Sequence, residues 1–167
     1  MELWDIYDKD KQLTGRTMKR NDWNMDDGDY HLTVLGVIRR SDGRFLITQR
    51  VLTKSWAAGC WEVPGGGVMH GESSMQAVRR ELLEEIGVDV SCAAGGYAFS
   101  YRRDNPLEKN NYFVDIYLFD MDITDNDITL CRSESAAFRF ASADEIKELA
   151  DRGLFLHYDS IKDIFMR

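Results

Sequence analysis

Hydrophobic residues along the chain follow a two-residue pattern in some segments and a helical pattern in others. β-rich runs occupy His31–Arg39, Phe45–Arg50 and Tyr112–Asp120. The first two are joined by a turn with an Asp-Gly pair, which is a strong hairpin signal. Shorter strands are expected at Trp61–Val63, Val88–Phe99 and Ala137–Phe140. These segments predict a sheet as the centre of the fold.

Three more polar segments lie before or between the predicted strands of the main sheet. Leu3–Thr14 alternates loosely around a polar centre and predicts a small hairpin, and Gly15–Asp29 is polar enough to be a connector. Tyr101–Asn111 predicts an exposed loop. Residues 1–30 are therefore expected to form a hairpin and a connector ahead of the main sheet.

Helices are expected at three places. Pro64 and the three glycines after it should end regular structure, and a helix should follow over Ser73–Ile86, with Gly87 as its left-handed C-terminal residue. A capping-box pattern at Ser142–Glu145 opens a second helix that Gly153 can close. The tail Asp159–Met166 predicts a short third helix. Strands and helices in this order indicate an α+β or α/β sandwich with helices on a mixed sheet.

Composition limits the class of protein. The 167 residues, 44% hydrophobic and 30% charged, fit one globular domain over 1–167. The formal net charge of −8 argues against a partner that is a nucleic-acid polymer, which needs a basic face. A small anionic substrate remains compatible if a metal ion bridges the negative groups.

Further features bear on the cellular setting. Cys60, Cys92 and Cys131 show neither a disulfide framework nor zinc-like spacing, which favours a reduced compartment. The first residues lack the apolar region of a signal peptide, and no run is long enough to span a membrane. We expect a cytoplasmic protein without a membrane partner. A homodimer is left open.

The predicted helix at 73–86 carries an unusual concentration of acid. On a helical wheel, Met75, Val78, Leu82 and Ile86 form an apolar stripe, and Glu81, Glu84 and Glu85 occupy the adjoining face. Like charges at this spacing repel and cost helix stability. A solvated surface is the ordinary explanation of such a face when the glutamates stand alone.

The neighbouring residues favour a metal site instead. Arg80 can hold Glu84 one turn away, and Glu72 lies just before the helix. Hard divalent ions such as Mg²⁺ take oxygen ligands of this kind. The glycines at 65–67 have no Cβ atoms, so the backbone there can approach a ligand closely.

The spacing of these residues is that of a known signature. From Gly66 the chain reads G-x5-E-x7-R-E-U-x-E-E-x-G-U with U aliphatic, ending at Val88, and every fixed position is matched. Seven fixed residues at about one in fifteen each give a chance match of about 10⁻⁸ per frame. The chain thus resembles the Nudix hydrolase superfamily.

The resemblance implies a fold and a reaction. Members fold as an α/β/α sandwich in which the box forms a loop, a helix and a loop. They hydrolyse a phosphoanhydride bond in a nucleoside diphosphate linked to another moiety, with Mg²⁺ or Mn²⁺. By resemblance, the metal ligands are Glu81, Glu84, Glu85, Glu72 directly or through water, and the carbonyl of Gly66. Arg80 would orient the glutamates.

The resemblance leaves the general base and substrate contacts open. Glu134 and Glu85 are both candidate bases, and a plain surface position is the alternative for Glu134. Side chains that could stack on a base or contact phosphate, with packing or solvation as the alternative, are Trp4, Trp23, Trp56, Tyr101, Tyr112, Arg102 and Arg103.

Two alternatives to a Nudix hydrolase remain. The segments at 4–15 and 50–64 resemble a branch that also resembles isopentenyl diphosphate isomerase. That enzyme needs a cysteine in a T-N-x-C-x-H type motif, whereas Cys60 here precedes Trp61 in CWEVPGGG. A non-catalytic nucleotide-binding Nudix domain is the other alternative, but such domains commonly lose acids that this box keeps.

Overall fold

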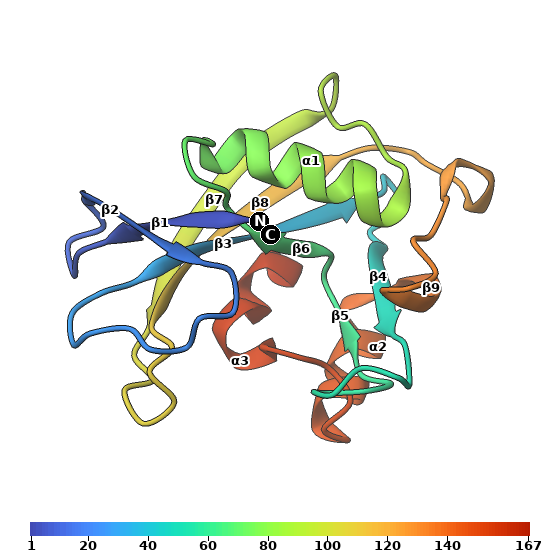
Figure 1. Ribbon diagram of the computed structural model, residues 1–167. Helices are drawn as coiled ribbons and strands as arrows, with labels where there is room; N and C mark the ends of the chain where they lie inside the picture. Colours follow the sequence, from blue (N-terminus) through green and yellow to red (C-terminus); the bar gives the residue numbers. More distant parts are fainter.

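The computed structural model describes residues 1–167 and places helices on both faces of a mixed β-sheet (Figure 1). The main path of the sheet runs in the order β5 (Trp61–Glu62), β4 (Phe45–Arg50), β3 (His31–Arg39), β8 (Tyr112–Asp120) and β7 (Ala94–Arg103). Off this path, β6 (Gly65–Gly67) pairs with β3, and β9 (Ser135–Ala141) pairs with β4. The expected mixed sheet is confirmed.

The sheet divides where β3 and β4 separate. The two strands pair only at Arg39 and Phe45, beside their hairpin turn. Farther along, β6 lies antiparallel to β3 over Thr33–Leu35, while β4 pairs with β5 and β9. β3 and β8 form the parallel pair of the sheet. The divergence of β3 and β4 opens the space in which the candidate site lies.

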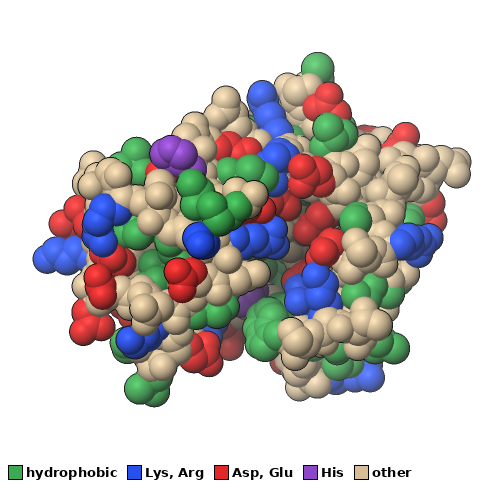
Figure 2. Space-filling model, viewed as in Figure 1, with side chains coloured by type: hydrophobic (Ala, Val, Ile, Leu, Met, Phe, Trp, Pro, Cys, Tyr) green, Lys and Arg blue, Asp and Glu red, His purple; other side chains and the backbone are tan.

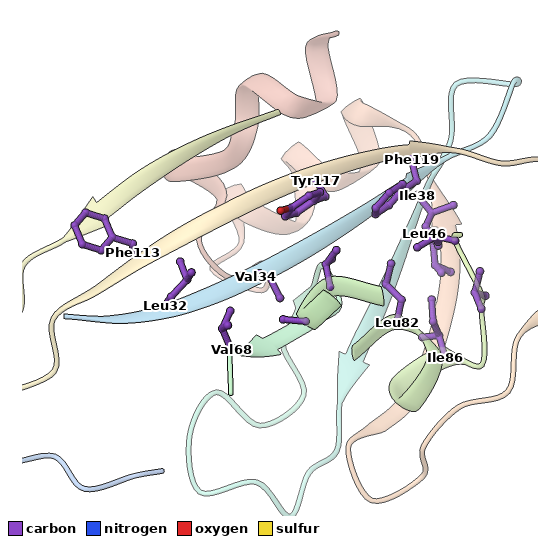
Figure 3. Packing of buried hydrophobic residues seen from close by; sticks show 14 of the residues in the cluster. Leu32, Val34, Ile38, Leu46, Val68, Leu82, Ile86, Phe113, Tyr117 and Phe119 are labelled. Atoms are coloured by element: carbon purple, nitrogen blue, oxygen red, sulfur yellow. The ribbon is translucent and has the colours of Figure 1, made fainter. Parts of the chain in front are cut away.

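One face of the sheet is covered by α1 (Ser74–Ile86). Its buried residues include Val78, Leu82 and Ile86, which pack with side chains from β3, β4 and β8 (Figure 3). Full burial of each such aliphatic side chain contributes roughly 1.5–3 kcal/mol. This packing fixes α1 against the sheet and so turns its acidic side toward the space beside β6.

The opposite face is covered by the C-terminal part of the chain. It contains α2 (Ala143–Asp151), α3 (Tyr158–Ile161) and a 3₁₀ helix over Lys162–Met166. Ile146, Ile161 and Ile164 are fully or almost fully buried against strand residues of that face. A second 3₁₀ helix spans Asp125–Asp127. None of the helices is both long and apolar enough to cross a bilayer.

The predicted helix boundaries follow the capping residues. Ser73 caps α1 in a capping box with Gln76, and Gly87 ends the helix in the left-handed conformation at φ 71°. Ser142 caps α2 through the predicted box with Glu145. The third helix is present, although its second half is 3₁₀ rather than α. Local sequence chemistry therefore predicted these ends well.

The N-terminal hairpin is longer than predicted. β1 (Leu3–Tyr7) pairs with β2 (Leu13–Lys19), so residues 15–19, predicted as part of a connector, are strand. Only Met18 of β2 is buried, which leaves little alternation to detect in the sequence. The bridge between Tyr7 and Tyr30 brings the hairpin against the start of β3.

Two other predicted boundaries are wrong. The strand expected at Val88–Phe99 is β7 at Ala94–Arg103, so it takes the first residues of the predicted 101–111 loop. Its pairing with β8 fixes these limits, with a bulge near Ala98 that disturbs the alternation. The glycines at 65–67 do not end regular structure, because β3 supplies their strand partner.

Candidate active site

Each of the three glycines of β6 lies where a side chain would not fit. A Cβ atom on the first would lie 2.0 Å from the carbonyl oxygen of Val34 in β3. On the second it would lie 2.4 Å from the carboxylate of Glu81, and on the third 2.6 Å from the ring of Trp4. The run Gly65–Gly67 therefore lets a strand lie between β3, the N-terminal hairpin and the acidic side of α1.

Arg80 organises the acidic residues around it. Its Nε and Nη2 donate to the two oxygens of Glu72 at 2.8 and 3.0 Å, and its Nη1 donates to Glu81 at 2.7 Å. Nη2 also donates to the carbonyl of Gly67 at 3.0 Å. Burial by itself would raise the pKa of Glu72, but the hydrogen bonds from Arg80 and a backbone N–H lower it. The expected partner Glu84 is more distant, at 3.4 Å, and its side chain is 60% exposed.

Glu81 and Glu85 are the partly buried acids of α1, whereas Glu84 is exposed. Burial raises the pKa of Glu81, with Arg80 opposing the shift. Burial raises the pKa of Glu85 well above its ordinary value, and the charges of Glu81 and Glu62 add to this effect. The N–H of Gly65 donates to Glu85 at 3.3 Å. The surroundings of Glu85 in the protein thus disfavour its charged form.

These residues line a cleft of about 460 Å³. It runs between α1, β6, β5 and the segment before β9, and charged side chains of both signs gather in a hollow near the middle of this face (Figure 2). Of the predicted site residues, the lining includes Gly66, Arg80, Glu81, Glu84, Glu85 and Glu134. Glu72 does not line the cleft and acts on it through Arg80.

Glu134 reaches this cleft from a part of the chain remote from the box. It forms an ion pair with Lys54, and its backbone carbonyl accepts a hydrogen bond from the N–H of Val51 at 3.2 Å. Its side chain is 44% exposed. The structure thus brings both candidate bases, Glu85 and Glu134, to one cleft.

The oxygen donors of the cleft suit a hard divalent cation. No group of three or more acidic, His or Cys side chains is already arranged around one point, because Arg80 engages Glu72 and Glu81. The donor set of carboxylates beside backbone carbonyls nevertheless fits Mg²⁺ or Mn²⁺ chemically. A cation bound here would favour the charged form of Glu85, which burial and the neighbouring carboxylates disfavour.

The sequence analysis missed several charged residues of the cleft. Glu62 on β5 pairs with Arg50 at 3.3 Å, and burial raises the pKa of Glu62. Arg50, Lys54 and Glu62 all line the cleft. The position of Glu62, three residues before the glycine run, was a weak signal that it belongs to the site. Nothing in the sequence pointed to Lys54, since only the chain reversal between β4 and β5 brings it here.

The candidate stacking residues divide between core and surface. Trp4 is buried at 5% exposure, with its ring 4.6 Å from that of His31. The others line a second hollow of about 660 Å³, namely Trp23, Trp56, Tyr101 and Tyr112. Arg103 also lines it, whereas Arg102 pairs with Asp104 at 3.2 Å.

The comparison with known families places this sandwich, with its glycine strand beside an acidic helix, in the Nudix class. The sequence matches the family model described as the NUDIX domain over residues 29–163. This match spans most of the chain, which therefore belongs to the Nudix family of pyrophosphohydrolases.

Relatives and solved structures agree with this assignment. An uncharacterized Nudix hydrolase of Listeria monocytogenes is 30% identical over 166 residues, covering 99% of this chain and 94% of that protein. The CTP pyrophosphohydrolase of Escherichia coli is 40% identical over 73 residues, covering 44% of this chain and 52% of that protein.

The crystal structure of a Deinococcus radiodurans protein superposes with a TM-score of 0.75 at 20% identity, covering 92% of this chain and 91% of that one, and supports the fold alone. The MutT protein of Methanosarcina mazei gives a TM-score of 0.62 at 27% identity, with 83% and 94% coverage.

Proposed function

We propose that this Nudix hydrolase uses Mg²⁺ or Mn²⁺ to hydrolyse a phosphoanhydride bond in a nucleoside diphosphate linked to another moiety. The observation that supports this most is the cleft in which Glu81, Glu84 and Glu85 of the complete box lie beside the backbone of Gly66. The Escherichia coli relative, named for CTP, and the Proteus vulgaris 8-oxo-dGTP diphosphatase make a nucleotide substrate the natural expectation.

In this proposal the chain's own residues divide the work. Glu81, Glu84, Glu85 and the carbonyl of Gly66 would hold the metal, with Glu72 acting directly or through Arg80. A metal held by these residues would supply neutralisation of the diphosphate charge and activation of water. Arg80 keeps Glu72 and Glu81 in place through charge-assisted hydrogen bonds.

Basic side chains in the cleft can contact the anionic substrate. Arg20, Arg50 and Lys54 line it alongside the carboxylates. Guanidinium and ammonium groups stabilise phosphate oxygens as charge develops on them. Glu134 or Glu85 would take a proton from the attacking water. Glu134 is held at the cleft by its ion pair with Lys54.

A substrate panel tests the proposed reaction. Diphosphate-linked compounds are incubated with Mg²⁺ or Mn²⁺, and phosphate and pyrophosphate release is scored with and without an added phosphatase. The panel includes isopentenyl diphosphate with a readout for its isomer. Metal-dependent hydrolysis of at least one nucleotide supports the proposal, while isomerisation without hydrolysis, or activity that persists in EDTA, contradicts it.

The Glu85→Gln variant should lower turnover by about two orders of magnitude or more and weaken metal binding, because it removes a charged oxygen ligand. The fold should survive, since Gln keeps the shape of the side chain. Glu148→Gln on the exposed side of α2 is the matched control and should keep wild-type turnover. Wild-type turnover in Glu85→Gln would refute the metal-carboxylate site.

The same assay separates the two candidate bases. If Glu134 is the base, Glu134→Gln lowers turnover by about 10²–10⁴-fold while metal affinity stays at the wild-type level. If Glu85 is the base, Glu134→Gln retains most activity.

The isomerase alternative has less support. Its likeness in the segments 4–15 and 50–64 stays a prediction. Cys60, the cysteine of that region, does not line the cleft between α1 and β6. A non-catalytic role is also disfavoured, since every acid of the box is present.

A further inference from the structure

The second hollow, which we call the aromatic pocket, adjoins the catalytic cleft. It measures about 660 Å³, within the range of small-molecule sites. Thr33, Leu35 and His157 line both the pocket and the cleft. A ligand of moderate length can therefore occupy the two together.

The lining of the aromatic pocket combines aromatic rings with carboxamides. The rings come from Trp23, Trp56 and Tyr112 among others, and the carboxamides from Asn21, Asn105 and Asn110. Aromatic rings stack on planar groups. Carboxamides both donate and accept hydrogen bonds, so they suit a ring edge that carries donors and acceptors.

The charges distinguish the pocket from the cleft. The pocket has one arginine, Arg103, and one carboxylate, Glu108, among its lining residues. The cleft instead has Arg20, Arg50 and Lys54 beside the acidic helix. A phosphate group prefers the cleft on charge grounds, which leaves the pocket for an uncharged part of the substrate.

One side-chain atom in each of two pocket residues also lacks a hydrogen-bond partner within the protein. Nδ1 of His31 and the hydroxyl of Tyr101 are buried, and no group of the protein bonds to them. Both residues line the pocket, and His31 is only 4% exposed. Buried polar atoms without partners are costly and uncommon. The wall of the pocket is therefore polar as well as aromatic.

We propose that the aromatic pocket binds the nucleobase of the substrate, and that the diphosphate extends past His157 into the carboxylate cleft. This inference rests on the proposed function and assigns recognition to residues outside the box. An isoprenoid chain would fit poorly, because it would cover the carboxamides of the lining without bonding to them. The pocket thus selects nucleoside diphosphates over isoprenoid diphosphates.

Wild-type protein tests the selectivity directly. The kcat/KM values for ADP, GDP, CDP and UDP are compared with those for methyl diphosphate and isopentenyl diphosphate. We expect the best nucleoside diphosphate to exceed both by at least about 10-fold, the effect of one stacked base. Equal or better hydrolysis of the two compounds without a base would overturn the pocket assignment while leaving the phosphoanhydride reaction intact. No hydrolysis of these compounds or of any compound in the diphosphate-linked panel would instead count against the proposed function.

The Trp56→Ala variant tests the pocket itself. The Trp56 ring is 57% exposed and lies 5.3 Å from the Arg50 guanidinium. We expect the ratio of kcat/KM for the best nucleoside diphosphate to that for methyl diphosphate to fall about 10-fold. A disturbance that acts only through Arg50, a residue of the cleft, would lower the kcat/KM values of both compounds equally. The ratio would then stay unchanged, and this result would refute the assignment.

Leu52→Ala is the matched control for this variant. Leu52 belongs to the same chain segment, is 80% exposed and lines neither hollow, so its ratio should equal that of the wild type. An equal fall in Leu52→Ala would mean that the effect belongs to the segment and not to the ring.

Product inhibition of the wild-type protein is a further test of the aromatic pocket. The nucleoside monophosphate of the preferred base should inhibit wild-type hydrolysis of methyl diphosphate competitively, at least about 10-fold more strongly than methyl phosphate does. Equal inhibition by both compounds would show that the base adds no binding and would refute the assignment.

Discussion

At the scale of single residues, the glycines of β6 have different neighbours and therefore different roles. A Cβ atom at Gly66 would meet the end of the Glu81 side chain, which can move aside. A Cβ atom at Gly65 would meet the backbone oxygen of Val34 in β3, which cannot move without breaking strand pairing. Adjacent positions in one tripeptide thus serve the site and the fold separately.

The two alanine variants should separate accordingly. Gly66→Ala should reduce turnover strongly by displacing Glu81, with little change in thermal stability. Gly65→Ala should lower the free energy of unfolding by about 1–3 kcal/mol or more, as overpacking does. Denaturant unfolding and turnover are measured on both, and a larger stability loss in Gly66→Ala than in Gly65→Ala would contradict this division.

His31 gives a residue-scale prediction for pH dependence. Burial lowers the pKa of His31 to about 4, with the hydrogen bond to Asn110 opposing the shift. The unfolded chain, with a histidine pKa of about 6.5, therefore binds the proton first as pH falls. The stabilisation from neutral His31 is complete above pH 6.5 and is lost between that value and pH 4.

Between pH 7 and pH 5 this linkage should lower the free energy of unfolding by about 2 kcal/mol. Urea unfolding of the wild type and of His31→Gln at both pH values measures the effect. The variant should lose that share of the pH dependence, whatever its absolute stability. Identical pH dependence in the two proteins would disprove the assignment to His31.

At the scale of elements, a buried carboxylate of β8 helps to hold the N-terminal hairpin against the sheet. Lys11, in the turn between β1 and β2, forms an ion pair with Asp115 of β8 and donates to Ser100 of β7 at 3.1 Å. Asp115 also accepts from the hydroxyl of Ser74, at the start of α1, at 2.7 Å. The side chain of Asp115 is only 5% exposed, so these partners take the place of water around its carboxylate.

Removing the ammonium group of Lys11 should therefore lower the stability of the protein. Lys11→Met should destabilise the protein by about 3 kcal/mol, because it leaves a buried charge unpaired. Lys9→Met, in the same exposed turn, is the matched control and should change stability by less than about 0.5 kcal/mol. Thermal unfolding is measured, and the double variant Lys11→Met/Asp115→Asn should recover part of the loss.

Elements with local signals were the predictable ones. The ends of α1 and α2 follow from Ser73, Gly87 and Ser142, whose chemistry acts within a few residues. The limits of β2, β6 and β7 depend on partner strands far along the chain, so their sequences alone misled the prediction. The glycine strand is the clearest case, because only β3 makes it regular.

At the scale of the whole molecule, two hollows meet where β3 and β4 part. The box supplies one side of the catalytic cleft, while Arg50, Glu62 and Glu134 arrive from β4, β5 and the segment before β9. The aromatic pocket draws on the N-terminal segment, the β4–β5 connection and the loop before β8. Outside the box, the residues that line the cleft share no spacing that a sequence pattern can reveal, and neither do the residues of the aromatic pocket.

The sequence by itself determined the family and the acids of the box, because those residues lie on one loop and one helix with a fixed 3.6-residue period. Tertiary structure decided which acids of the box are partly buried and which is exposed, that Arg80 holds Glu72 and Glu81 more closely than Glu84, and that Glu134 pairs with Lys54. It also gathered four of the five candidate aromatic residues into one pocket. The physical reason is that burial and long-range contacts depend on how the strands pair across the whole chain, whereas helix periodicity and capping act over a few residues.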